Sequence, residues 1–273
     1  MLILNRRDSH PIPLEADCIR PDTMASLDAW SISNLPVWHG NISARLGDYF
    51  DIIGNASDGD VVVRGDCSRV KHLGCGMTAG TLRVESPVGM HAGADMRGGL
   101  LRVEGDADDW LGAEMHGGQI IVAGNAGNSV GSAYLGANRG MRGGEILVSG
   151  NAGNEVGATL RRGLIVIGGD VGNFPGINLL AGTLIVLGTC GVRPGAAMRR
   201  GSILLPHYTP ELLCTFAPAG PLDSVFPELY FRHLQRMVTK AGIPGLTRQP
   251  WPQMHRHAGD LASLGKGEIL CPA

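Results

Sequence analysis

The residues of this sequence that could do chemistry are basic side chains at a regular spacing. Five of the six intervals in the series are 19 residues, and its members are Thr78, Arg97, His116, Arg142, Arg161, Leu180 and Arg199, with Arg162 and Arg200 directly after two of them. Cations stacked in this way repel one another unless an anion or a carboxylate neutralises them. Asp95 and Glu114 can pair with the early members, whereas the later arginines lack such a neighbour.

These basic residues define one candidate binding stripe. Its members are Arg97, His116, Arg142, Arg161, Arg162, Arg199 and Arg200. Local ion pairs and ordinary solvation are one interpretation of the stripe. The other is a basic groove for a polyanionic tail or for the acidic surface of a partner. The chemistry expected of the stripe is binding, with no catalytic step.

Two further groups contain residue types that bind metal ions. Cys67, His72 and Cys75 lie close together, but their segment is irregular within the repeat and lacks a fourth ligand nearby. His255 and His257 with Asp260 resemble a loose ligand set and are more typical of a polar tail. No phosphate-loop or HExxH motif occurs in the chain. We therefore expect neither a catalytic residue nor a metal site.

A glycine repeat explains how the stripe is positioned. Glycine makes up 42 of the 273 residues, about twice its ordinary share of roughly 7%. Glycines precede the apolar segments at Gly80, Gly99, Gly118, Gly144, Gly163, Gly182 and Gly201. The intervals are 19 residues, except for one of 26 whose extra residues fall within 134–140. A fixed period of this length predicts stacked supersecondary units, with further glycines marking three corners in each unit.

The apolar residues follow the same period. Positions two and four after each of these glycines are aliphatic and share one face of a strand, and a third aliphatic column runs through Met77 and Met96. We predict an all-β fold, a right-handed parallel β-helix with 19-residue coils; a left-handed hexapeptide helix would need an 18-residue turn. The Asn or Asp after a corner glycine, such as Asp66 or Asp106, is predicted to hydrogen-bond its own turn.

The ends of the stack and one outer face need covers. We predict an N-terminal cap over residues 1–40, the GXGXG β-helix over 41–206, and a C-terminal helix and tail over 207–273 that pack on it. The tail is expected to contain an amphipathic helix over 224–237, with Ser224 as N-cap and an apolar face of Val225, Leu229, Leu234 and Met237. A Pro-rich passage from Pro244 to Pro252 and a strand near 267–271 are expected to follow. The outward residues of the later strands are apolar, so this tail or another subunit must cover them.

Net charge, apolar runs and cysteine spacing limit the classes of partner and the cell compartment that we expect. A net charge of −2 argues against a nucleic-acid partner, which selects a basic domain. No run of 18 apolar residues is present, and Arg6 and Arg7 stand where a signal peptide has its apolar stretch. Six scattered cysteines without a CxxC are typical of reduced thiols. We expect a cytoplasmic protein without a membrane partner.

The tandem glycine pattern carries a family resemblance. Segments Gly112–Asn125 and Gly157–Asp170 resemble the GXGXG β-helix family over about residues 40–206. That family includes the C-terminal domain of the glutamate synthase large subunit and the C subunit of formylmethanofuran dehydrogenase.

The flanking segments distinguish between these two family members. Pro13–Cys18, Leu35–Asn41, Leu46–Phe50 and the tail Gly259–Leu270 resemble the free-standing C subunit.

Two complexes share a protein of this type. The archaeal complex is a molybdenum or tungsten dehydrogenase that fixes CO2 onto methanofuran. The bacterial formyltransferase/hydrolase complex moves a formyl group between tetrahydromethanopterin and a methanofuran analogue and releases formate. The resemblance implies a scaffold subunit without an active site, packed against subunits of the A, B and D types, and the bacterial complex is preferred.

The resemblance also implies a ligand for the stripe. A methanofuran-type cofactor, held without a covalent bond at a subunit interface, carries a glutamate-containing tail that could lie along the arginines. Metals and pterin would be bound by partner subunits only. Two other classes stay open: a glutamate-synthase-like structural domain, and a solitary β-helix enzyme acting on carbohydrate, for which Asp95 with Glu114 is the one outward carboxylate pair.

Overall fold

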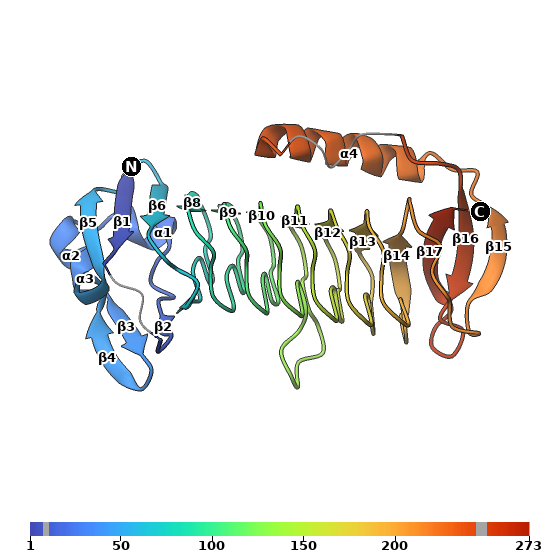
Figure 1. Cartoon of the computed structure of the whole chain (residues 1–273), viewed down its shortest axis with the longest axis horizontal. Helices are drawn as coiled ribbons and strands as arrows, with labels where there is room; N and C mark the ends of the chain where they lie inside the picture. The colour runs from blue at the N-terminus through green and yellow to red at the C-terminus, as the bar shows by residue number, and fades with distance from the viewer. Residues whose placement is uncertain (8–10, 244–249, 273) are drawn as a thin grey trace.

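The computed structural model describes residues 1–7, 11–243 and 250–272 of the chain. Figure 1 shows an elongated molecule in which a row of coils runs between two groups of terminal elements, with the long helix α4 along one side. Most of the regular structure is β, which confirms the predicted class at that level. Residues 244–249 of the predicted Pro-rich passage lie outside the described residues.

The central coils contribute one parallel strand each. These strands are β6 (Asp60–Arg64), β8 (Thr81–Val84), β9 (Leu100–Val103), β10 (Gln119–Val122), β11 (Glu145–Val148), β12 (Leu164–Ile167), β13 (Thr183–Val186) and β14 (Arg200–Leu204). Each pairs with the next in the register of the sequence repeat, so that Leu82 lies opposite Leu101. The predicted inward positions are buried, as Ile120 and Val122 are. Aliphatic ladders therefore hold successive coils together.

A second column of parallel bridges runs along another side of the coils. It links Cys67 to Val88, Val88 to Ala107, and continues through Ala126, Ala152 and Val171 to Cys190. Beside this column, Asp and Asn side chains connect neighbouring coils. The backbone N–H of Asn125 donates to Asp106 Oδ1 at 2.6 Å, and that of Asn151 donates to Asn125 Oδ1 at 2.9 Å.

The prediction of a local turn bond for these side chains is therefore wrong for most of the series. Only the first member, Asp66, bonds within its own turn, by accepting from the backbone N–H of Ser68 at 3.0 Å. In the stacked coils, the side-chain oxygen of each later Asp or Asn accepts a hydrogen bond from a backbone N–H of the next coil. These residues thus tie one coil to the next.

The corner glycines are required by close backbone approach. Gly144 has φ +90°, and a Cβ at this position would lie 2.7 Å from the carbonyl oxygen of Gly118 in the preceding coil. A side chain would therefore force the coils apart. Other corners use non-glycine residues in the left-handed region, among them Asp95, Glu114 and Asn178 with φ between 53° and 54°. Each of these residues lies two positions before a member of the basic series, so a carboxylate there can neutralise a neighbouring basic side chain.

The N-terminal elements extend the large sheet and add a small one. They are β1 (Leu2–Arg6), β2 (Leu14–Glu15), α1 (Pro21–Met24), α2 (Ala29–Ser33), β3 (Pro36–His39), β4 (Ile42–Arg45), α3 (Leu46–Tyr49), β5 (Phe50–Gly54) and β7 (Val70–Lys71). β1 is parallel to β6 and antiparallel to β5, whereas β2, β3, β4 and β7 form the separate four-stranded sheet. The helices and the small sheet lie at this end of the row of coils (Figure 1).

The C-terminal elements continue the sheet at the other end. β17 (Lys266–Pro272) is parallel to β14, which confirms the predicted last strand, and β16 (Met254–Gly259) and β15 (Ala217–Pro221) follow in antiparallel pairs. The whole sheet is mixed and open, with β5 and β15 at its edges. No helix within the described residues is long and apolar enough to cross a membrane.

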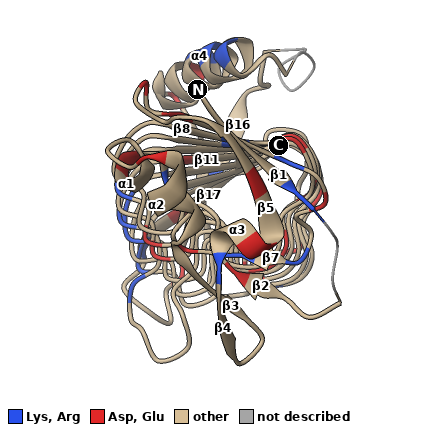
Figure 2. Cartoon of the chain, turned by 90° about the vertical axis from the view of Figure 1, so that its left-hand side faces the viewer, with Lys and Arg blue, Asp and Glu red and all other residues tan. Residues whose placement is uncertain are grey.

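Helix α4 (Phe226–Ala241) lies outside the coils, as the view along their stack shows (Figure 2). Its residues Leu234, Met237, Val238 and Ala241 form one buried cluster with the outer side chains of the later strands. Those side chains are Ile121, Leu147, Val166, Ile185 and Leu204. The apolar outer face is therefore covered by this chain's own helix.

The helix differs in detail from the sequence prediction. It begins two residues later and ends four residues later than the predicted 224–237, with Val225 at the N-cap. The Oγ of Ser224, the predicted N-cap, accepts a hydrogen bond from the backbone N–H of Phe226 at 3.2 Å. Of the residues predicted on the apolar face, Leu234 and Met237 are buried, whereas Val225 and Leu229 are exposed. Phe231 is buried in addition. The prediction of the buried face is therefore confirmed for the later part of the helix and wrong for its start.

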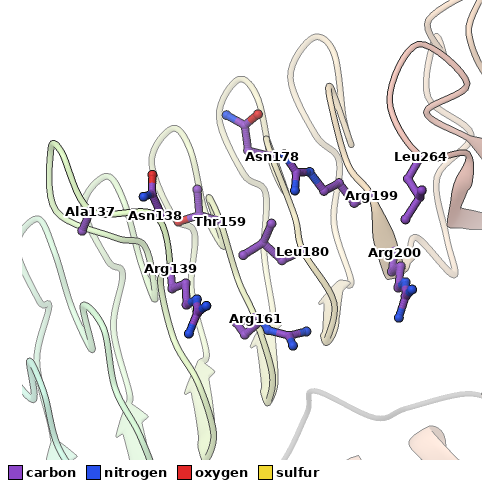
Figure 3. Close-up of a pocket in the computed structure, with 10 residues that line it drawn as sticks. All are labelled: Ala137, Asn138, Arg139, Thr159, Arg161, Asn178, Leu180, Arg199, Arg200 and Leu264. Atoms are coloured by element: carbon purple, nitrogen blue, oxygen red, sulfur yellow. The ribbon is translucent and has the colours of Figure 1, made fainter.

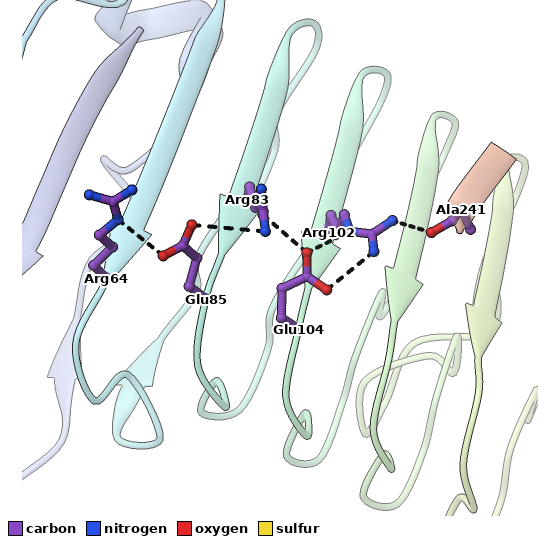
Figure 4. A network of polar contacts seen from close by, with 6 residues as sticks. All are labelled: Arg64, Arg83, Glu85, Arg102, Glu104 and Ala241. Carbon is purple, nitrogen blue, oxygen red and sulfur yellow. Dashed lines mark hydrogen bonds and ion pairs between the residues drawn. The ribbon is translucent and has the colours of Figure 1, made fainter. Parts of the chain in front are cut away.

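A ladder of ion pairs crosses the outer face of the earlier strands, which α4 does not cover. Arg64 pairs with Glu85 at 3.0 Å, Arg83 with Glu104 at 3.0 Å, and Arg102 with Glu104 at 2.7 Å (Figure 4). Arg102 also donates to the carbonyl oxygen of Ala241 at the end of α4. This contact satisfies a terminal carbonyl and places a cation at the negative end of the helix dipole.

Candidate functional site

The basic stripe is aligned by backbone hydrogen bonds between coils. The N–H of Arg97 donates to Met77 O at 2.8 Å, that of Arg161 to Met141 O at 2.9 Å, and that of Arg199 to Leu179 O at 2.8 Å. Each acceptor belongs to a residue whose aliphatic side chain is buried in the core. The members of the stripe therefore lie one above another at the spacing of hydrogen-bonded strands, about 4.8 Å.

The early members of the stripe, Arg97, His116 and Arg142, contact carboxylates of this chain. Asp95 lies 3.1 Å from Arg97 Nη2 and 3.0 Å from His116 Nδ1. Arg142 Nη1 lies 3.1 Å from His116 Nε2, and Arg142 Nη2 lies 3.7 Å from Glu114. These side chains form one connected network of three basic and two acidic groups. Local pairing, one of the two interpretations of the stripe, applies here.

The late members line a groove instead. Its volume is about 910 Å³, and it is lined by Ala137, Asn138, Arg139, Thr159, Arg161, Asn178, Leu180, Arg199, Arg200 and Leu264. In Figure 3 Arg199 extends toward Asn178, Arg139 and Arg200 point downward, and Arg161 points to the right of the view. Arg162, a member of the predicted stripe, is exposed and does not line the groove.

Four guanidinium groups in this groove have no carboxylate partner among the described residues. Arg139, Arg161, Arg199 and Arg200 form no ion pair within 4.0 Å in residues 1–7, 11–243 and 250–272. Two such cations about 5 Å apart repel by roughly 0.8 kcal/mol in water and by more where solvent is displaced. An anion in the groove would remove this repulsion.

The difference between the two halves lies in the left-handed corner two residues before each member. Asp95 and Glu114 occupy this corner in the early coils, whereas Thr159, Asn178 and Ala197 occupy it in the later ones. The later coils thus replace carboxylates by neutral groups, two of which can donate hydrogen bonds. Along this column the early coils therefore carry carboxylates beside their basic side chains, whereas the later coils carry none at the same corner.

Arg139 is the groove residue that sequence reasoning missed. It lies in the region 134–140, which departs from the 19-residue period, so it has no register with the stripe. The backbone folds this region back until Gly140 N–H donates to Thr159 O at 3.0 Å. The seven additional residues were a signal that a loop leaves the coil here. Their sequence does not say toward which side the loop turns.

The other predicted groups do not converge. Cys67 belongs to the bridge column, and burial raises the pKa of the Cys67 and Cys75 thiols to about 11. His255 and His257 lie on β16, opposite Cys271 and Ile269. Over the described parts of the chain, no three His, Cys, Asp or Glu side chains are placed to hold a metal ion.

An aromatic cluster at another corner was also missed. His72 stacks on His91 with ring centroids 4.7 Å apart, and Tyr134 OH lies 3.1 Å from His91 Nδ1. The Tyr134 ring lies 5.2 Å from that of Trp110. Burial lowers the pKa of both histidines and raises the pKa of Tyr134 to about 12, so the cluster is uncharged near neutral pH. It packs the base of the loop 134–140.

Comparisons with known proteins show the family to which this chain belongs. No family model matches the chain. The C subunit of the molybdenum-containing formylmethanofuran dehydrogenase 1 of Methanothermobacter marburgensis is 44% identical over 89 residues, which cover 32% of this chain and 22% of that protein. The C subunit of the tungsten-containing formylmethanofuran dehydrogenase 2 of Methanothermobacter thermautotrophicus is 39% identical over 93 residues, or 33% of this chain and 34% of that protein. The matches thus span about a third or less of these relatives.

A solved structure matches over nearly the full length. A chain in the crystal structure of the formyltransferase/hydrolase complex (FhcABCD) from Methylorubrum extorquens, in complex with methylofuran, superposes with a TM-score of 0.89 and 33% identity. The match covers 99% of both chains. The protein is therefore of the class of subunits found in formyl-transferring complexes. It belongs to the family formed by the C subunit of formylmethanofuran dehydrogenase and its counterpart in the formyltransferase/hydrolase complex.

Proposed function

We propose that the chain is the scaffold subunit of a complex that transfers and hydrolyses the formyl group of a formylmethanofuran-type cofactor, and that it has no active site of its own. The full-length match to a chain of such a complex carries this proposal. The groove supports it, because its arginines and amides can bind an anion but include neither a nucleophile nor a general base. The relatives of the A, B and D subunit types would supply the chemistry.

The architecture proposed for this scaffold is a right-handed parallel β-helix. Parallel pairing of β8 to β14 in the register of the repeat and the second column of bridges support this architecture. The handedness follows from the strong preference of parallel strand connections for right-handed crossovers. Residues 1–40 would act as the N-terminal cap, 41–206 as the helix and 207–273 as the C-terminal cover.

The ligand proposed for the stripe is the anionic tail of the cofactor, held at a subunit interface. The groove fits such a group because four guanidinium groups, which have no carboxylate partner in the part of the chain that the structure describes, line it with Asn138 and Asn178. Charge-assisted hydrogen bonds from arginine are suited to carboxylates in particular. Arg97 and Arg142 would contribute less, because their charges already face Asp95 and Glu114, and His116 already contacts Asp95 and Arg142. The pterin and metals would stay in other subunits.

The C subunit of an archaeal formylmethanofuran dehydrogenase is the second candidate. It is favoured by the higher identity of those relatives, 44% over 89 residues against 33% for the full-length match. The bacterial complex is preferred because 99% of the length of both chains superposes there. Mass spectrometry of the subunits that co-purify with the tagged chain, together with assays for formyl transfer and CO2 reduction, separates the two.

The ligand proposal is tested by charge removal in the purified complex. Replacing Arg139, Arg161, Arg199 and Arg200 by Gln should lower the affinity of the complex for the cofactor by roughly 30-fold or more, and its cofactor content accordingly, since four contacts of about 0.5–1 kcal/mol are lost. Arg83→Gln is the matched control, because Arg83 lies outside the stripe and is paired with Glu104. Unchanged cofactor content in the quadruple variant would refute the ligand proposal.

A further inference from the structure

The loop 134–140 presents one leucine at the tip of a tight turn. Ala137 N–H donates to Tyr134 O at 2.9 Å, and Gly136 has φ +88°, the geometry of a type II turn with Gly at its third position. Leu135 occupies the second position and is 96% exposed. An apolar side chain of this size in water gains free energy when a partner buries it.

The base of the loop is anchored on both sides. Tyr134 N–H donates to Glu114 Oε1 at 3.2 Å, and its hydroxyl contacts His91 while its ring packs beside Trp110. At the other end Gly140 is buried, and a Cβ there would lie 2.7 Å from Gly131 O. Leu135 is therefore held in place before any partner binds. Docking on it would cost little ordering entropy.

The surroundings of Leu135 are basic. Arg139 lies four residues further along the same loop and lines the groove with Arg161, and neither pairs with a carboxylate among the described residues. A partner that buries Leu135 must bring its own surface next to these cations. Charge complementarity then selects carboxylates at the rim of the partner's site.

We propose that Leu135 is a docking knob that inserts into an apolar socket, rimmed by Asp or Glu side chains, on another protein subunit. The inference rests on the proposed function only in taking that partner to be a member of the same complex. A second copy of this chain offers no socket with a free acidic rim among the hollows of the described residues. The hollow of about 360 Å³ around Val192 and Tyr208 contains Glu211 but also Arg193, and the smaller one of about 180 Å³ beside Trp251 contains only Glu228, which already pairs with Arg232 at 2.7 Å.

Site-specific photocrosslinking tests which protein contacts the knob. A photoreactive phenylalanine analogue replaces Leu135 in the tagged full-length chain, and the complex is purified from the native host before irradiation. The expected product joins position 135 to a different subunit, at a segment that contains Asp or Glu beside apolar residues. An intact complex without a crosslink, or a crosslink to a second copy, overturns the knob alone. A chain that purifies without partners overturns the proposed function as well.

Side-chain truncation tests whether the knob contributes to binding. Labelled chain in the purified complex is chased with unlabelled chain, and its dissociation rate is measured. Leu135→Ala should dissociate about tenfold faster and Leu135→Met no more than about twofold faster, because Met retains most of the apolar volume. Val225→Ala, at another exposed apolar residue, is the control. A Leu135→Ala rate within twofold of the unsubstituted chain would contradict the proposal.

Discussion

Replacing Leu234 by Ala should release helix α4 from the coils without unfolding them. Leu234 is fully buried at the centre of the cluster between α4 and the later strands. Truncating a buried Leu costs about 2–5 kcal/mol, and the lower half of that range applies because a surface helix can settle into the space. A loss of about 2–3 kcal/mol corresponds to a roughly 30- to 150-fold increase in the equilibrium constant for opening.

Amide hydrogen exchange measures this opening residue by residue. The amides of α4 should exchange faster by the same factor in the variant, whereas those of β11 to β13 should keep their rates because the coils bond to one another independently of the helix. Leu229→Ala, five residues earlier in the same helix, is the matched control, since Leu229 is 59% exposed. Its effect should stay within about 0.5 kcal/mol. Equal acceleration in the helix and the strands would refute the reasoning, because it would mean that α4 and the coils open as one unit.

Three further predictions concern the coils. Gly144→Ala should lower the free energy of unfolding by at least about 2 kcal/mol in urea titrations, because its Cβ would meet Gly118 O in a left-handed conformation; Gly242→Ala, with open space, should cost about 1 kcal/mol. A thiol reagent at pH 8 should modify exposed Cys214 rapidly but leave Cys67 unmodified, since burial raises the Cys67 pKa to about 11. Burial lowers the pKa of His91 in the folded state, so the unfolded chain binds more protons and the free energy of unfolding should fall as the pH drops through about 6.5. His91→Gln should flatten this pH dependence. An unchanged slope in the variant would contradict the prediction.

The repeat was predictable because each coil obeys the same two physical demands. Inward aliphatic residues must alternate along a strand, and corners must accept close backbone contacts, so both leave a 19-residue pattern in the sequence. The parallel register of Leu82 with Leu101 and the burial of Ile120 follow from that pattern. The stripe was predictable for the same reason, because residues at equal places in successive coils stack.

What could not be predicted depends on contacts between residues out of register. Arg139 reaches the groove through a loop whose direction is set by Tyr134 packing on Trp110 and His91. The role of Asp106 as a bond to the next coil depends on the distance between coils, which no single turn reveals. The exposure of Leu229 likewise depends on how α4 packs against strands that are distant from it in the sequence.

The loop 134–140 belongs to two surfaces at once, since Ala137, Asn138 and Arg139 form a wall of the groove and Leu135 projects from the same turn. Carboxylates on the partner's rim and an anion in the groove would draw on the same guanidinium groups. Thermodynamic linkage then requires that each weaken the binding of the other by the same factor. In such a scaffold, binding of the anionic ligand would lower the affinity of the chain for the neighbouring subunit.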